Sequence, residues 1–147
     1  RSPESHFTLA NFMRTHLYTS LGAVKMGLDI LMEDEKVKVD CIMGHGGLFK
    51  TKNVGQRYLA AAVGAPVTVM DTASEGGAWG IALLAAYLID KTKDEKLEDY
   101  LENRIFGKLS GETIQPYEED KKGFNLFMMH YKAGLEIEKK VIEVMNW

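Results

Sequence analysis

The chain has a single cysteine and little net charge, and both facts exclude classes of protein. Cys41 is the only cysteine among 147 residues, so no disulfide can form within the chain. The formal net charge is −3, which gives no basic surface for nucleic acid, so we expect no nucleic-acid partner. No apolar run reaches the roughly 18 residues that cross a bilayer, so no membrane partner is expected. These features, together with 8 methionines and no signal-like leader, favour a cytoplasmic location.

Histidine spacing typical of a metal site is also missing. No two histidines stand four residues apart, and none is paired with the cysteine, so no metal ligands are predicted. His45 alone lies in a segment with functional character, and there we expect a solvated or backbone-bonded imidazole.

What is present suits one globular domain over residues 1–147. Hydrophobic residues make up 46% of the chain and charged residues 27%, and this length buries roughly two thirds of the unfolded surface. Arg1 is neither an initiator methionine nor the start of a targeting peptide, so we expect the chain to belong to a longer protein.

Apolar periodicity predicts helices and two strands. A helix of about 25 residues begins near Ser5 or Thr8, and the pattern at residues 67–70 predicts a strand. Further helices are predicted at 53–63, with Gly64 as its left-handed cap, at 77–88, at 96–105 and from about 118. The pattern also predicts a strand at 36–43 with Cys41 buried in it, and a loop at 107–116. A strand, helix and strand in such short order favour a right-handed parallel unit, and so an α/β fold.

A glycine turn follows the first predicted strand. Gly44, Gly46 and Gly47 have no Cβ atoms, so a planar or phosphorylated ligand could approach the backbone closely. The plain alternative is that these glycines only form a turn. Lys50 and Lys52 also allow two interpretations, contact with phosphate or simple solvation.

A second turn follows the second strand. Ser74 and Glu75 could cap the next helix, or Glu75 could orient the first turn or balance charge near a metal-bound phosphate. Gly76, Gly77 and Gly80 are expected to let another backbone pack very close to that helix.

One alternative for the first turn is a dinucleotide site. Gly44-x-Gly46 after a strand, with Asp71 at the end of the next strand, imitates a nicotinamide-binding unit of an oxidoreductase. Phe49 stands where the third glycine of that motif belongs, so the imitation is incomplete. A non-catalytic interaction module is a further alternative.

The order of these motifs resembles the carboxy-terminal domain of FGGY-family carbohydrate kinases. The resemblance rests on CIMGHGG, on a following helix with Gln56, on GAPVTVM and on EGGAWGIALLAAYL. Glu75, Ala78, Gly80 and Ala82 fit the family form E-x-x-A-x-G-x-A, and the final helix is similar to the family's terminal helix.

The resemblance implies an actin-like, ribonuclease-H-type α/β lobe with long helices on a small, mainly parallel sheet. It also implies ATP and Mg²⁺ as cofactors. Gly44, Gly46 and Gly47 would border adenosine and its first phosphates, with Leu48 and Thr51 beside the base or ribose. Glycerol kinases tend to carry Ala-Asn-Asn after this turn and this chain carries Lys-Thr-Lys, so a pentulose such as xylulose or ribulose is the expected substrate.

No residue here matches the family's catalytic aspartate, so we assign no catalytic residue to this chain. That aspartate and the sugar-binding lobe are expected upstream of Arg1, and the intact enzyme would transfer the γ-phosphoryl group of ATP to a sugar hydroxyl. The chain alone should bind nucleotide weakly. We also expect it to self-associate, because the family's first strands are missing and a sheet edge would be exposed.

Overall fold

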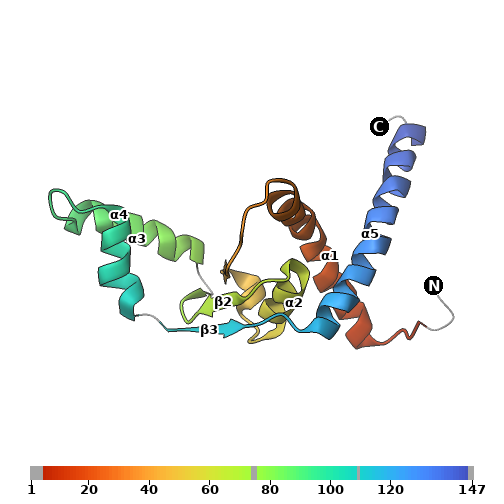
Figure 1. The fold of residues 1–147 in the computed structure, drawn as a ribbon, viewed down its shortest axis with the longest axis horizontal. Coiled ribbons are helices and arrows are strands. Elements are labelled where there is room, and N and C mark those ends of the chain that lie inside the picture. The colour runs from red at the N-terminus through yellow and green to blue at the C-terminus, as the bar shows by residue number, and fades with distance from the viewer. Residues whose placement is uncertain (1–4, 74–75, 109, 146–147) are drawn as a thin grey trace.

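The computed structural model describes residues 5–73, 76–108 and 110–145. These residues form a mixed α/β body, residues 5–73 and 110–145, and a helical arm, residues 76–108. In Figure 1 the arm extends to the left of the sheet, whereas helices α1 (Leu9–Asp29) and α5 (Glu118–Met145) stand at the right. Within the described residues, no helix has both the length and the apolar character needed to cross a membrane.

Helix α1 begins where the sequence predicts a cap. The Thr8 hydroxyl oxygen accepts a hydrogen bond from the Asn11 amide at 3.1 Å, which satisfies one of the donors in the first turn. The helix continues into a π-helical turn, Ile30–Asp34. Its predicted apolar stripe reaches the core at Leu21, which is buried, whereas Val24 near the far end remains exposed.

Three short strands form one sheet in the order β1-β2-β3. Strands β1 (Ile42–Gly44) and β2 (Val67–Met70) are parallel and are joined by helix α2 (Val54–Val63), which confirms the predicted strand–helix–strand unit. Gly64 ends α2 with a φ of 69°, the left-handed cap that the sequence predicts. Strand β3 (Gly111–Ile114) runs antiparallel to β2, so the sheet is mixed and not mainly parallel.

Two predictions about strands are wrong. The strand predicted over residues 36–43 begins only at Ile42, whose amide donates to the Pro66 carbonyl at 2.9 Å. Just before Pro66 the neighbouring segment turns away into α2. Among the described residues, residues 36–41 therefore have no strand to pair with. Strand β3 lies inside the predicted loop 107–116, because four residues are too few to show an alternating pattern.

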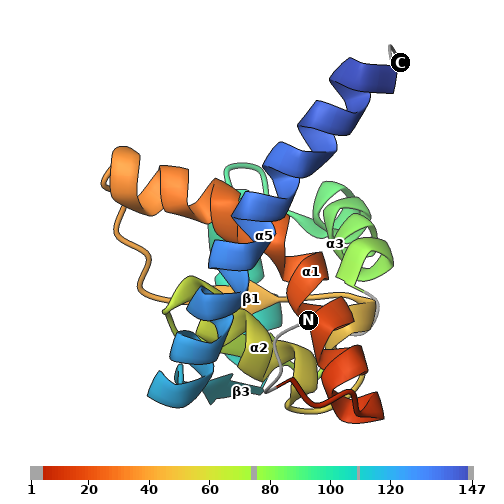
Figure 2. The ribbon, with the colours of Figure 1, turned by 90° about the vertical axis from the view of Figure 1, so that its right-hand side faces the viewer.

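Helices cover one face of the sheet. Helix α2 packs on β2 and β3, and α1 and α5 pack against α2 (Figure 2). Val67 of β2 and Phe124 of α5 are fully buried in this layer, and the Tyr18 ring of α1 meets Phe124 edge-on with 4.9 Å between the centroids. The core therefore lies between α2 and its neighbours, on one side of the sheet only.

The other face of the sheet, here called the open face, faces solvent. Its side chains follow from strand alternation and from the register of the three strands. A row of contacts crosses it: the Thr68 hydroxyl oxygen lies 3.2 Å from Cys41 Sγ and 2.7 Å from the Thr113 hydroxyl. Cys41 is exposed just before β1, so the prediction of a buried strand cysteine is wrong. The open face consists of Cys41, Met43, Thr68, Met70, Gly111 and Thr113.

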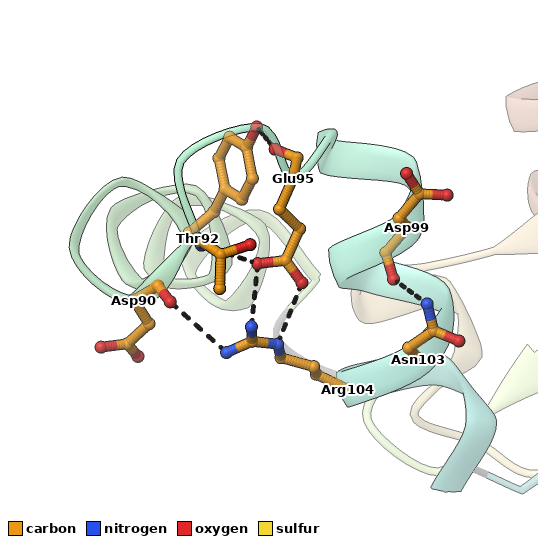
Figure 3. A network of polar contacts seen from close by, with 7 residues as sticks. Asp90, Thr92, Glu95, Asp99, Asn103 and Arg104 are labelled. Carbon is orange, nitrogen blue, oxygen red and sulfur yellow. Dashed lines mark hydrogen bonds and ion pairs between the residues drawn. The ribbon is translucent and has the colours of Figure 1, made fainter.

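The arm is a compact group of helices braced by polar and aromatic contacts. It contains α3 (Gly76–Asp90) and α4 (Leu97–Tyr100), which confirm the helices predicted at 77–88 and 96–105. The α4 helix continues as a π-helical turn, Leu101–Ile105, and a 3₁₀ turn, Phe106–Lys108. Figure 3 shows how Arg104 from this second segment binds the Glu95 carboxylate, with the closer contact at 2.8 Å, and the carbonyl of Asp90.

Candidate functional site

The turns that follow β1 and β2 lie side by side at the carboxyl edge of the sheet. Parallel strands bring their carboxyl ends to one edge, which is where α/β proteins bind ligands. The Gly46 amide donates to the Ala73 carbonyl at 2.7 Å, and a Cβ atom added to Gly76 would lie 2.8 Å from the Cβ of His45. The structure thus brings the first glycine turn, residues 44–47, against the start of α3.

The three glycines of this turn have different surroundings. Gly44 is buried beneath Phe49, and a Cβ atom at this position would lie 2.6 Å from the Phe49 ring. Gly46 has a φ of 101°, which residues with a side chain rarely adopt. Within the part of the chain that the structure describes, no atom lies within 4 Å of the Cβ positions of Gly46 and Gly47. The outer side of the turn is therefore open, and it is not enclosed by the core.

Leu48 and Thr51, both expected beside a ligand, are placed in different surroundings. Leu48 lies in the 3₁₀ turn Gly47–Phe49 and packs against the core cluster, and its Cγ would be 2.7 Å from a Cβ atom on Gly55. Thr51 is exposed and lines a cavity beside the turn. The structure brings Thr51, but not Leu48, to this cavity.

The cavity has a volume of about 220 Å³ and a polar lining. Lys52 reaches the Glu112 carboxylate of β3 across it, with 3.2 Å between Nζ and Oε2. For Lys52 the sequence leaves open phosphate contact or simple solvation, and the structure adds an ion pair with Glu112. The lining consists of Phe49, Lys50, Thr51, Lys52, Asn53, Gln56, Val69, Met70, Asp71 and Glu112.

Gln56 forms the inner wall of the cavity and ties α2 to the sheet. Its side chain is buried, and Nε2 donates to the Val67 carbonyl at 2.8 Å and to the Glu112 carbonyl at 2.6 Å. The amide therefore joins a helix to both strands of the β2–β3 pair. This arrangement gives a structural reason for a glutamine at this position.

Two acidic residues of the site were not foreseen in these roles. Glu112 belongs to the strand that the sequence did not predict, and its only signal is the short β-branched pair that follows it. Asp71 lies at the end of β2, where its carboxylate accepts a hydrogen bond from the Ser110 hydroxyl and its amide donates to the Ser110 carbonyl at 3.2 Å. Ser110 thus links the two chain segments that enter and leave the arm.

Ser74 and Glu75 lie outside the described residues. Among the described residues no atom lies within 4 Å of the Cβ positions of Gly77 and Gly80, so the room predicted beside them is present and no described backbone fills it, and the nearest atoms to a Cβ on Gly76 belong to the His45 side chain. Within the described residues, no three His, Cys, Asp or Glu side chains lie close enough to hold a metal ion.

The residues of both turns fall within a match to a known protein family. Residues 1–89 match the FGGY family of carbohydrate kinases, C-terminal domain, and this stretch is more than half of the 147-residue chain. The chain belongs to the FGGY family of carbohydrate kinases. No curated protein and no solved structure matches the chain.

The family match includes α1, β1, α2, β2 and nearly all of α3, and therefore the whole glycine turn. It stops at Ile89, before β3 and α5, so the predicted likeness of the last helix to the family's terminal helix stays a prediction. The match does not favour the nicotinamide-binding alternative. The Phe49 ring, which stands in place of that motif's third glycine, lies against Gly44.

Proposed function

We propose that this chain is the nucleotide-binding part of a sugar kinase that phosphorylates a pentulose such as xylulose or ribulose. The nucleotide would be ATP with Mg²⁺, bound at the carboxyl edge of an actin-like lobe. The observation that carries the proposal is the open outer side of Gly46 and Gly47, within a family of carbohydrate kinases.

The turn contributes an open surface for a ligand more than it contributes hydrogen-bond donors. Because the Gly46 amide is already bound to the Ala73 carbonyl, it is not available to a phosphate oxygen. What remains is an uncrowded stretch of backbone at positions 46 and 47, where a side chain would stand in the way of the nucleotide. Gly44 acts differently, since it makes room for the Phe49 ring that supports the turn from below.

The neighbouring cavity supplies polar groups for the rest of the nucleotide. The Thr51 hydroxyl can bond a ribose oxygen, and the Lys52 ammonium can turn from Glu112 toward a phosphate. Such an exchange would leave the Glu112 carboxylate facing solvent, where its charge costs little. Leu48 would support the turn from the core side and would not touch the base.

The remaining chemistry would come from outside the described residues. ATP would supply the γ-phosphoryl group, and Mg²⁺ would be carried on the phosphates, as is usual for this ion at nucleotide sites. The residues of this chain position the nucleotide, and positioning is a large part of catalysis in phosphoryl transfer. A second lobe with an aspartate base would hold the sugar, and the intact enzyme would work in the cytoplasm.

We also propose that the isolated chain self-associates through β1. The Ile42 amide points toward β2, so the backbone groups of Met43 point to the opposite side, where no described strand pairs with them. Free strand edges of this kind pair with other chains.

Calorimetry tests the nucleotide proposal. The 147-residue chain is titrated with a non-hydrolysable ATP analogue and Mg²⁺, and separately with NAD. Gly47→Val adds a side chain over the open side of the turn and should weaken binding of the analogue about tenfold or more. Gly27→Val is the matched control, because no described residue lies within 4 Å of this Cβ position on α1 either, and the position lies far from the turn in the chain.

Each result has a definite meaning. A preference for NAD overturns the assignment of ATP. Unchanged affinity in Gly47→Val shows that the nucleotide does not bind at the turn. If the enzyme completed with its sugar lobe does not phosphorylate a pentulose, the proposed substrate class is wrong.

A further inference from the structure

The side-chain amide of Gln56 has one polar atom that its contacts with the sheet do not use. Both of its hydrogen bonds run from Nε2, to the carbonyls of Val67 and Glu112. Two carbonyl oxygens can be bonded only by the nitrogen of the amide, so these contacts fix which way the amide points. Among the described residues, no donor bonds the remaining atom, Oε1.

This oxygen opens on the cavity beside the glycine turn. Gln56 is only 4% exposed, and it lines that cavity. Of the buried side-chain oxygen and nitrogen atoms in the described part of the chain, Thr72 Oγ1 is the one that is enclosed without a partner, so Gln56 Oε1 is not enclosed. Buried polar groups are almost always hydrogen-bonded, and Oε1 therefore requires a donor that enters the cavity.

Glu112 places a second acceptor at the same cavity. It lies opposite Val69 in the sheet and, by strand alternation, on the face that α2 covers. Its carbonyl is bound to the Gln56 amide at 2.6 Å, so the two residues are held together. Its carboxylate reaches Lys52 across the cavity, with 3.2 Å between Nζ and Oε2. The cavity thus has a fixed amide oxygen and a carboxylate next to each other.

The ion pair between Lys52 and Glu112 is easily exchanged. The Lys52 side chain is 80% exposed and the Glu112 side chain 46%, and ion pairs as exposed as this contribute little to stability. When Lys52 turns to a phosphate, as the proposed function requires, the Glu112 carboxylate is free to accept hydrogen bonds from the same ligand.

The size and the chemistry of the cavity favour one part of a nucleotide. Its volume of about 220 Å³ is below the roughly 300–1,000 Å³ of pockets that enclose a whole ligand, so it holds a fragment. Adenine carries one amine donor among ring nitrogens that accept, and it would set acceptors against acceptors here. A ribose carries two neighbouring hydroxyl groups, and both can donate. Acidic side chains hold ribose hydroxyls in the same way at dinucleotide sites.

We propose that Gln56 and Glu112 hold the ribose of the bound nucleotide. One of the two neighbouring hydroxyl groups donates to Gln56 Oε1 and the other to the Glu112 carboxylate. This inference rests on the proposed nucleotide site and adds the residues that recognise the sugar of the nucleotide. Glu112 lies on β3, beyond the residues 1–89 that match the family, so the sugar is held partly by a segment outside that match.

Nucleotides that lack single hydroxyl groups test the proposal. The 147-residue chain is titrated in a calorimeter with ATP, 2′-deoxy-ATP and 3′-deoxy-ATP, each with Mg²⁺. Loss of either hydroxyl should weaken binding about fivefold or more, because a buried acceptor then loses its donor. In Glu112→Ala, only one of the two deoxynucleotides should still bind more weakly than ATP, since Gln56 keeps its own hydroxyl.

Two variants serve as controls. Glu112→Gln keeps an acceptor oxygen on a side chain of the same length and should keep the preference for both hydroxyls. Glu119→Ala removes an exposed carboxylate at the start of α5 and should bind all three nucleotides as the native chain does. Circular dichroism shows whether each variant is folded.

Adenosine gives a second measurement that leaves Glu112 in place. It has both hydroxyl groups but no phosphate, so in the native chain it competes with Lys52 for the Glu112 carboxylate. Lys52→Gln removes this competitor and should tighten the binding of adenosine about twofold or more. Unchanged or weaker binding of adenosine would contradict the exchange of partners at Glu112.

The outcomes separate this inference from the proposed function. Equal binding of ATP and both deoxynucleotides would overturn the ribose site, while the nucleotide site would stand. A full preference for both hydroxyls in Glu112→Ala would also overturn it, because Glu112 would then hold neither. If the native chain binds none of the nucleotides, the proposed function is wrong and the ribose site is wrong with it.

Discussion

The side-chain amide of Gln56 donates to the backbone carbonyl of Val67 at 2.8 Å, and this bond lies inside the protein between α2 and the sheet. The same amide reaches the Glu112 carbonyl of β3 at 2.6 Å. A buried glutamine with two strand carbonyls as partners fixes the distance and register between one helix and two strands. The cavity beside the glycine turn has its inner wall at this point, so the stability of the fold and the shape of the site are coupled.

Replacement of Gln56 by leucine should therefore destabilise the chain. Gln56→Leu keeps a similar volume but leaves two carbonyls without their donor, which costs about 1–3 kcal/mol in the free energy of unfolding. Urea denaturation measures the change. Gln115→Leu is the matched control, because Gln115 is exposed, and it should shift stability by no more than about 0.5 kcal/mol. Equal effects of the two substitutions would show that the buried bonds are not needed.

The contact between Gly44 and Phe49 gives a second prediction. Gly44→Ala places a Cβ atom 2.6 Å from the Phe49 ring, and overpacking of this kind costs typically about 1–3 kcal/mol. The same substitution should cost much less in a Phe49→Ala background, where the ring is gone. Urea denaturation of the four chains forms a double-mutant cycle. An equal cost in both backgrounds would mean that Gly44 is required for a reason other than this ring.

Tyr18 gives the stability of the core a dependence on alkaline pH. Burial raises the pKa of the Tyr18 phenol above its ordinary value of 10.0, although the Arg14 guanidinium opposes the shift. The neutral phenol is thus favoured in the folded chain, so its contribution is complete below about pH 10 and is lost as the pH rises through the folded pKa. Tyr18→Phe should lose less stability than the native chain between neutral pH and pH values above 10.

Thermal denaturation over that pH range measures the difference. Tyr117→Phe is the control, because Tyr117 is 56% exposed, and this variant should follow the native chain. Parallel curves for Tyr18→Phe and the native chain would show that Tyr18 ionises equally easily in both states.

The sequence predicts those parts of the fold whose signals lie within a few residues. Thr8 caps α1 and Gly64 caps α2 because a hydroxyl or a missing Cβ acts on the adjacent helix end. Strand β3 and the position of Glu112 depend on pairing with β2, which lies about forty residues away in the sequence, and no local pattern shows it. The sequence also predicts a buried Cys41, and this is wrong because no local pattern shows which face of the sheet the helices cover.

The candidate site shows the same difference between local signals and contacts of distant segments. Gly44, Gly46 and Gly47 are identifiable as a turn because they follow an apolar run. That Gly46 binds Ala73, that Leu48 turns to the core and that Lys52 meets Glu112 all depend on contacts between separate segments. The glycines were therefore predictable as positions, and their individual roles were not.

The outer edge of β1 provides the last prediction. Met43→Pro removes the amide that points away from β2 and leaves the Ile42 amide, which bonds the Pro66 carbonyl, in place. If chains associate by pairing at this edge, the variant should stay monomeric at concentrations where the native chain forms dimers or larger species, as measured by sedimentation equilibrium. Ile42 adopts the extended conformation that a following proline requires, so the strand itself should persist. Thr113→Pro, on β3, serves as the comparison that tests whether loss of any strand amide has this effect. Association of the Met43→Pro chain at native strength would place the contact on another surface, such as the exposed apolar end of α5.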